Sequence, residues 1–150
     1  MVANLIAVPL DILYKTDFVE WTEEMANLIE SRRTEEFDWV HLADEVRDLG
    51  TSQRSAVRSH LSILLQHLVK WEIQSGRRCR SWEDSISNAR TAIDALTEDI
   101  PSLGRHLADS FDQTYEKAAR RAFAETRLPA STHYTRWSKE QVLDPGFLPK

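Results

Sequence analysis

Apolar residues recur three and four positions apart along most of the chain, which is the spacing of one face of an α-helix. The first such stretch follows Asp17, which with Glu20 has the spacing of a capping box at a helix N-terminus. The apolar face of the helix that it predicts consists of Phe18, Trp21, Met25, Leu28 and Ile29. Residues 1–16 carry no comparable pattern, so we expect a loosely ordered arm there.

A second helix is predicted between Asp38, a suitable N-cap residue, and Gly50, since glycine commonly follows the last helical turn. Its apolar stripe consists of Trp39, Leu42, Ala43, Val46 and Leu49. At about 100° per residue, His41 points away from this stripe and Glu45 lies at its edge.

A third helix is predicted from Thr51 or Ser52 to about Gln74. Its apolar positions cover an arc of roughly 200°, which is wider than a surface helix needs. They are Val57, Leu61, Ile63, Leu64, Leu65, Leu68, Val69 and Trp71. We therefore expect this helix to form the centre of a bundle, with His60 and His67 inside the same arc.

Two further helices follow a turn at Gly76. Ser81 with Asp84 predicts the start of the fourth helix by the same capping-box spacing. Its packing seam is Trp82, Ile86, Ala89, Ile93, Leu96 and Ile100. Pro101 then breaks the chain, and Ser102 predicts the cap of the fifth helix. The inward positions of that helix are Leu103, Leu107, Phe111, Tyr115, Ala118, Ala122 and Phe123.

Few helix breakers interrupt this pattern, because the 150 residues include only four glycines and five prolines. We predict an all-α fold, a single helical bundle of about five helices with a central third helix. The length fits one domain covering residues 1–150. Within it, residues 129–150 are expected to form an extended tail with one short helix, begun by Ser138.

Charge and composition exclude several classes of protein. The net charge of −5 argues against a general binder of nucleic acids, which requires a basic face. Cys79 is the only cysteine, so no intramolecular disulfide forms, and a reducing compartment is the simpler inference. The opening MVANLIAVPL lacks a basic region and a cleavage site, and no run of 18 apolar residues occurs. We expect a cytoplasmic protein with no membrane partner.

One candidate for chemistry is a metal site. His41 and Glu45 are four residues apart, so both can reach one ion, and His67 would add a ligand from the third helix. Two histidines and a carboxylate suit zinc, nickel, manganese or non-haem iron. However, no H-E-x-x-H motif is present, and His41 equally fits a solvated acidic face, while His67 fits a core-edge histidine bonded to backbone. We therefore expect no cofactor, with a divalent metal as the alternative.

A second candidate is the basic cluster of Arg77, Arg78 and Arg80, just before a predicted helix N-terminus, which suits a phosphate or a carboxylate. With Trp71 and Trp82 beside it, the cluster also suits a protein partner. The competing interpretation is that these arginines pair with acidic helices or stack on Trp71 and Trp82, which flank them. Cys79, between arginines, has the setting of a lowered thiol pKa, but an incidental cysteine is the simpler interpretation.

The order of these signals resembles a known family. In sequence they are LYKTDFVEWTEEMANLI, FDWVHLADEVRDLG, LLQHLVKW, RRCRSW, PSL, YEKAARRAFAETRLP and DPGFLP. Together, over residues 13–149, they look like the bacterial domain-of-unknown-function family 29. The resemblance implies an all-helical fold and no established activity. Glu45, His67 and Arg78 match polar positions that recur in the family. This chain departs from it at Asp44–Arg47, where the family often has E-E-I-E, and at the stretch THYTRW.

Three hypotheses of function remain. The leading one is a small non-catalytic module that binds an unidentified protein partner through a helical face. The alternative is a metal-dependent, hydrolase-like enzyme using Glu45, His67 and His41, in which the metal activates water. The third, regulation of nucleic acids through the three arginines, is disfavoured by the net charge. The seam of the fourth helix and the tryptophans would also serve a homodimer.

Overall fold

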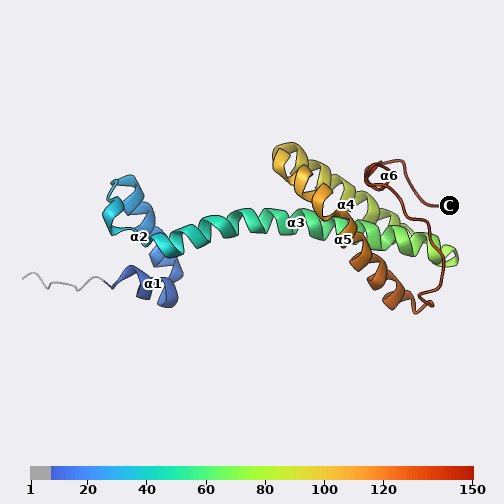
Figure 1. The fold of residues 1–150 in the computed structure, drawn as a ribbon, viewed down its shortest axis with the longest axis horizontal. Coiled ribbons are helices and arrows are strands. Elements are labelled where there is room, and N and C mark those ends of the chain that lie inside the picture. Colours follow the sequence, from blue (N-terminus) through green and yellow to red (C-terminus); the bar gives the residue numbers. More distant parts are fainter. Residues whose placement is uncertain (1–7) are drawn as a thin grey trace, which may run out of the picture. The chain divides into compact units, whose positions relative to one another are not determined.

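A computed structural model describes residues 8–150, which form six α-helices, two short 3₁₀ helices and no β-strand (Figure 1). The elements are α1 (Leu10–Thr16), α2 (Phe18–Glu30), η1 (Thr34–Glu36), α3 (Trp39–Ile73), η2 (Ser75–Arg77), α4 (Arg80–Asp99), α5 (Pro101–Thr126) and α6 (Lys139–Leu143). The all-α prediction is therefore confirmed. The chain divides into two compact units, residues 1–51 and residues 52–150, and we describe each by itself. The single domain expected over residues 1–150 stays a prediction.

Helix α3 is one continuous helix of 35 residues, so the prediction of two helices separated at Gly50 is wrong. No described glycine has a positive φ, which means that no left-handed glycine ends a turn there. Thr51 does not cap a new helix, because its hydroxyl donates to the carbonyl of Arg47, one turn back, at 3.1 Å. A single glycine costs a helix only about 1 kcal/mol, which is too little to break it when both flanks are strongly helical.

The first unit is built from α1, α2, η1 and the start of α3. Its buried core consists of Trp21, Met25 and Leu28, and the partly buried residues around it are Leu10, Leu13, Tyr14, Phe37 and Leu42. Asp17 caps α2 as predicted, accepting a hydrogen bond from the backbone N–H of Glu20 at 3.1 Å. For residues 10–16 the loosely ordered arm is wrong, since they form α1. The part of that arm at residues 1–7 lies outside the described residues.

The second unit packs α4, α5 and α6 on the second half of α3. Leu61, Leu64, Leu65 and Leu68 of α3 are completely buried, which confirms that this stretch is central. The predicted seam of α4 and the inward face of α5 also lie in this core. The two helix starts differ from prediction, because the N-cap positions are occupied by Cys79 and Ile100 instead of Ser81 and Ser102, and neither makes a side-chain cap.

The segment after α5 returns along the second unit. It has no regular structure until Ser138, which caps α6 in a full capping box with Gln141. Trp137 and Val142 are buried in the core of the second unit. Arg90 of α4 is also buried, and its guanidinium donates to the carbonyl oxygens of Val142 at 2.9 Å and Phe147 at 2.8 Å. A buried cation on α4 therefore holds the C-terminal segment in place.

Candidate functional site

The polar side chains of the first unit gather around Asp38, the residue just before α3. Its carboxylate lies 2.6 Å from Nδ1 of His41 and accepts a hydrogen bond from the indole N–H of Trp21 at 3.3 Å. Burial raises the pKa of the Asp38 carboxyl, but hydrogen bonds from His41 and Trp21 outweigh it and leave the pKa below its ordinary value. Asp38 is therefore a carboxylate that joins α2 to α3.

Tyr14 of α1 completes this cluster. Its ring stacks on His41 with 3.9 Å between ring centroids, and its hydroxyl donates to Oε1 of Glu45 at 2.7 Å. This hydrogen bond, together with burial and the nearby carboxylates, raises the pKa of Tyr14 to about 12. The tyrosine thus stays protonated at neutral pH and acts as a fixed donor to Glu45.

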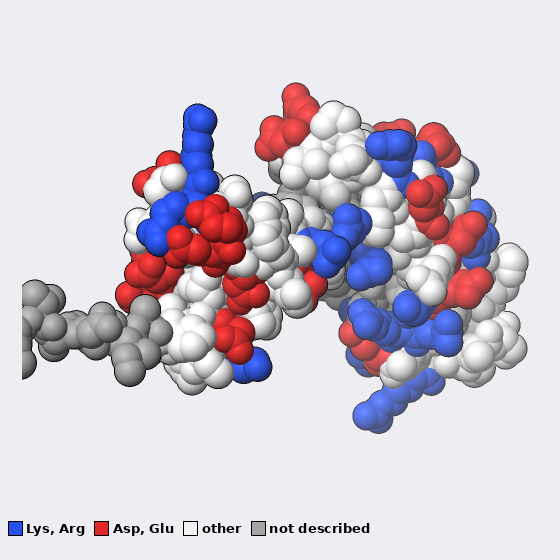
Figure 2. Space-filling model, turned by 60° about the vertical axis from the view of Figure 1, so that its left-hand side comes forward, with Lys and Arg blue, Asp and Glu red and all other residues white. Residues whose placement is uncertain are grey.

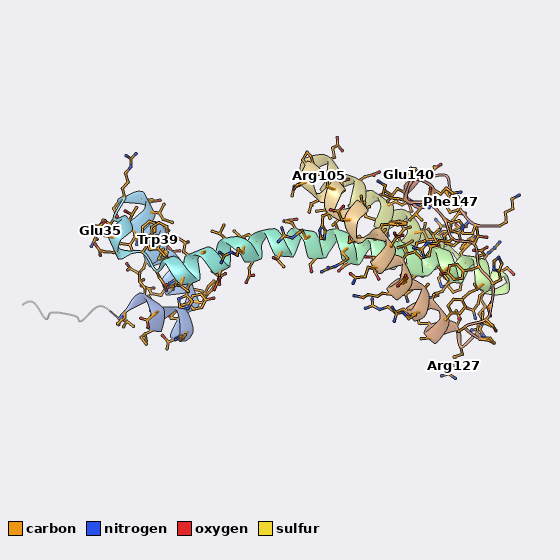
Figure 3. All side chains as sticks on the ribbon, in the orientation of Figure 1. Glu35, Trp39, Arg105, Arg127, Glu140 and Phe147 are labelled. Atoms are coloured by element: carbon orange, nitrogen blue, oxygen red, sulfur yellow. The ribbon has the colours of Figure 1, made fainter. Side chains whose placement is uncertain are left out.

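The face of α3 that packs in the first unit matches the predicted stripe only in part, since Leu42 lies against the core. Tyr14 covers His41 and Glu45, whereas Trp39, Val46 and Leu49 of the expected apolar stripe are 58%, 60% and 72% exposed. Trp39, at the start of α3, is labelled in Figure 3. Helix α1 explains why His41 and Glu45 are covered, because its Tyr14 supplies an aromatic ring for the histidine and a hydroxyl for the glutamate. Hence His41 does not lie on a solvated acidic face.

The three metal candidates are each engaged in another way. Nδ1 of His41 faces Asp38, and Glu45 accepts from Tyr14. His67 belongs to the second unit, where its Nδ1–H donates to the carbonyl of Ile63 at 2.8 Å. Between residues 8 and 150 no group of three or more histidine, cysteine, aspartate or glutamate side chains is arranged to hold a metal ion. A divalent metal at these residues stays a prediction from the sequence.

A groove of about 980 Å³ lies in the first unit and has Asp38 in its lining. Its apolar lining is Val8, Pro9, Leu10, Leu13, Leu28 and Phe37. Its acidic lining is Asp11, Glu20, Glu24, Glu36 and Asp38. Arg33 is the one cation among the lining residues, and it forms two hydrogen bonds with Glu36, at 2.7 and 2.6 Å. We call this feature the acidic groove.

In the basic cluster around η2, Arg78 stacks on a tryptophan, which agrees with the competing interpretation for this one residue. The guanidinium of Arg78 lies 5.2 Å from the ring centre of Trp71 and donates from Nε to the Trp71 carbonyl at 2.8 Å. Trp82 is covered instead by the ammonium of Lys70, at 4.7 Å. A pocket of about 500 Å³ beside this cluster is lined by Trp71, Arg78, Cys79, Arg80, Glu83 and Asp84. The two carboxylates oppose anion binding there.

Charge is distributed unevenly between the two units. Residues 1–51 contain twelve acidic and four basic residues, a net charge of −8, whereas residues 52–150 contain twelve and fifteen, a net charge of +3. Figure 2 shows acidic side chains crowded over the first unit and a band of lysine and arginine side chains on the second. The whole-chain charge of −5 therefore conceals one strongly acidic unit and one mildly basic unit.

The fold and the distribution of charge define an all-helical protein with one acidic unit and one basic unit. The chain belongs to the family described as domain of unknown function DUF29, whose model matches residues 13–148, so the resemblance seen in the sequence is confirmed. No curated protein and no solved structure matches the chain. Between residues 8 and 150, no helix has both the length and the apolar character needed to cross a membrane.

Sequence reasoning missed the acidic groove and Tyr14. The groove draws on α1, α2 and η1, and two of these three elements were not predicted. One signal was visible in the sequence: Glu20, Glu24 and Leu28 are spaced four apart, so they share one face of a helix. Without α1, nothing indicated that this face borders a groove.

Proposed function

We propose that the protein is a non-catalytic interaction module whose acidic groove binds a cationic amphipathic helix of a protein partner. The observation that carries the proposal is the composition of the groove, with six apolar residues and five acidic residues against one cation. Grooves of this kind accept helices that place apolar side chains in the groove and basic side chains along its edges.

Exposed apolar surface supports a role in binding for the first unit. Eleven large hydrophobic residues are exposed among residues 8–150, and nine of them lie in the first unit. They are Val8, Ile12, Phe18, Val19, Ile29, Trp39, Val40, Val46 and Leu49. They add apolar surface to the unit that carries the groove, and one of them, Val8, lines the groove itself.

Charge complementarity decides the chemistry of the partner. The Arg33 charge is neutralised by Glu36, which leaves the exposed carboxylates of Asp11, Glu20 and Glu24 in the lining. A segment rich in lysine or arginine would be attracted to these carboxylates. Among the described residues, the lining contains no unpaired cation that would repel it. An acidic partner would meet like charges, so the groove selects against it.

The test uses the full chain and a synthetic peptide of 18 residues, with leucine at helical spacing on one face and lysine on the other. We expect saturable binding by fluorescence anisotropy, weakening as salt increases because the contacts are partly ionic. The double substitution Glu20→Lys with Glu24→Lys should weaken binding at least tenfold. The same peptide with glutamate for lysine should bind that variant and not the original chain.

The matched control is Glu23→Lys with Glu30→Lys, which makes the same charge change on exposed positions of α2 outside the groove. It should leave the affinity for the lysine peptide within about threefold. Equal losses in both double variants would mean that overall charge, not the groove, attracts the peptide. A concentration-dependent dimer in sedimentation, blocked by the groove substitutions, would assign the groove to a second copy and overturn the proposal.

A further inference from the structure

A second groove, of about 500 Å³, lies between α3 and α5 in the second unit. From α3 it is lined by Arg58, Ser59, Ser62, Ile63 and Gln66, and from α5 by Gln113, Thr114, Lys117 and Arg121. Eight of these nine side chains are polar or cationic, and none is a carboxylate. We call this feature the cationic groove.

Two side-chain contacts join the helices that form the walls of the cationic groove. Arg121 donates to the hydroxyl of Ser62 at 3.4 Å, and Gln66, one turn along α3, donates to Glu125, one turn along α5. Arg58 lies one turn before Ser62 on α3, and Lys117 lies one turn before Arg121 on α5. A helical turn is only about 5.4 Å long, and all three cations line the same groove.

The cations of this groove are not neutralised within the protein. In residues 8–150 no ion pair joins Arg58, Lys117 or Arg121 to a carboxylate, although several other cations of the chain are paired in this way. Glu125, beyond the groove, is occupied by Lys70 at 2.9 Å, and this hydrogen bond lowers the pKa of Glu125. Three unpaired cations among hydroxyl and amide donors make a setting for oxyanions.

We propose that the cationic groove binds a small polyvalent oxyanion, a ligand that carries two or more phosphate groups. Its volume lies within the usual range of small-molecule sites. Its lining has no aromatic ring on which a nucleobase would stack, so a single-stranded nucleic acid is disfavoured. The proposal is independent of the acidic groove, which lies in the other unit.

Isothermal titration of the full chain with inorganic pyrophosphate and tripolyphosphate tests this proposal. We expect one site per chain, tighter for either polyphosphate than for orthophosphate at the same ionic strength. Lys117→Gln with Arg121→Gln should weaken binding at least tenfold, because it removes two of the three cations. Both residues are exposed, so the helical circular dichroism signal should not change. In NMR spectra the side-chain amides of Gln66 and Gln113 should shift on titration.

The control is Arg105→Gln with Lys150→Gln, which removes two exposed cations of the second unit that lie outside the groove. It should change the affinity less than twofold. Equal weakening in both double variants would mean diffuse charge attraction and would overturn the proposal, as would the absence of pyrophosphate binding. A 20-base-pair DNA that binds more tightly than tripolyphosphate, and loses binding in the groove variant, would assign the groove to a nucleic acid backbone instead.

Discussion

At the residue scale, Asp38 links two elements of the first unit. It accepts from the Trp21 indole of α2 and faces the ring of His41 on α3. Trp21 is only 2% exposed, so its indole N–H finds no water if the carboxylate is lost. The small core of the first unit therefore relies on one polar residue at its edge.

Asp38→Ala should destabilise the first unit by about 1–3 kcal/mol, the cost of leaving a buried donor without its acceptor. Urea titration followed by tryptophan fluorescence measures this change in the free energy of unfolding. Glu23→Ala, at an exposed position of α2, is the control and should stay within about 0.5 kcal/mol of the original chain. Equal effects of the two substitutions would contradict the role given to Asp38.

Acid should destabilise the first unit through the same residue. The pKa of Asp38 is lower in the folded chain than its unfolded value of about 3.9. Its contribution to stability is thus present above pH 4 and is lost as the pH falls through the folded pKa. Urea titrations between pH 5 and pH 2.5 should show this loss, and the Asp38→Ala variant should show a smaller acid dependence. Identical pH profiles for both chains would refute this assignment.

At the element scale, the sequence predicted helices better than their ends. Apolar spacing located the buried faces of α4 and α5, because those helices pack on one side over many turns. Gly50, Ser81 and Ser102 misled the prediction of helix ends, since each signal is worth only about 1 kcal/mol and the neighbouring packing decides. The acidic groove was not predictable because α1, which lines it, was not predicted. The cationic groove was not predictable because facing residues such as Ser62 and Arg121 are 59 positions apart.

Gly50→Ala should stabilise α3 by about 0.5–1 kcal/mol, because alanine loses less backbone entropy than glycine in a helix interior. Thermal unfolding followed at 222 nm measures the gain. Gly104→Ala in α5 is the comparison, since a Cβ atom there meets nothing within 4 Å and a similar gain is expected. A loss of stability and helicity in Gly50→Ala alone would show that residue 50 is not helical in solution.

Arg90→Gln should release the C-terminal segment from α4. Three backbone carbonyls, of Val142, Pro145 and Phe147, lose a charged donor, at a cost of about 1–3 kcal/mol. Faster hydrogen exchange at the Val142 amide would report the release. Arg90→Lys should recover only part of the protection, because an ammonium cannot match the planar fork of the guanidinium. Unchanged exchange in both variants would mean that Trp137 and Val142 anchor the segment without Arg90.

At the scale of the whole molecule, the two units differ in how much apolar core they contain. The buried cluster of the first unit has three residues, whereas that of the second has nineteen. The stability of a unit rises with the apolar area that it buries, at roughly 25 cal/mol per Å². The first unit also keeps most of the exposed apolar residues that a partner would cover. A weak unit with an open groove fits a role in which binding completes its core.

The first unit should therefore open before the second. We expect the amides of α2 to exchange with solvent at lower urea concentrations than those of α5, because local opening of a small core costs less free energy than global unfolding. Hydrogen exchange at increasing urea measures both in one experiment. Addition of the lysine-rich peptide should raise protection in α2 and leave α5 unchanged, since a ligand stabilises only the state and region that it binds. Simultaneous exchange of α2 and α5 at all urea concentrations would contradict this prediction and show that the chain unfolds as one cooperative body.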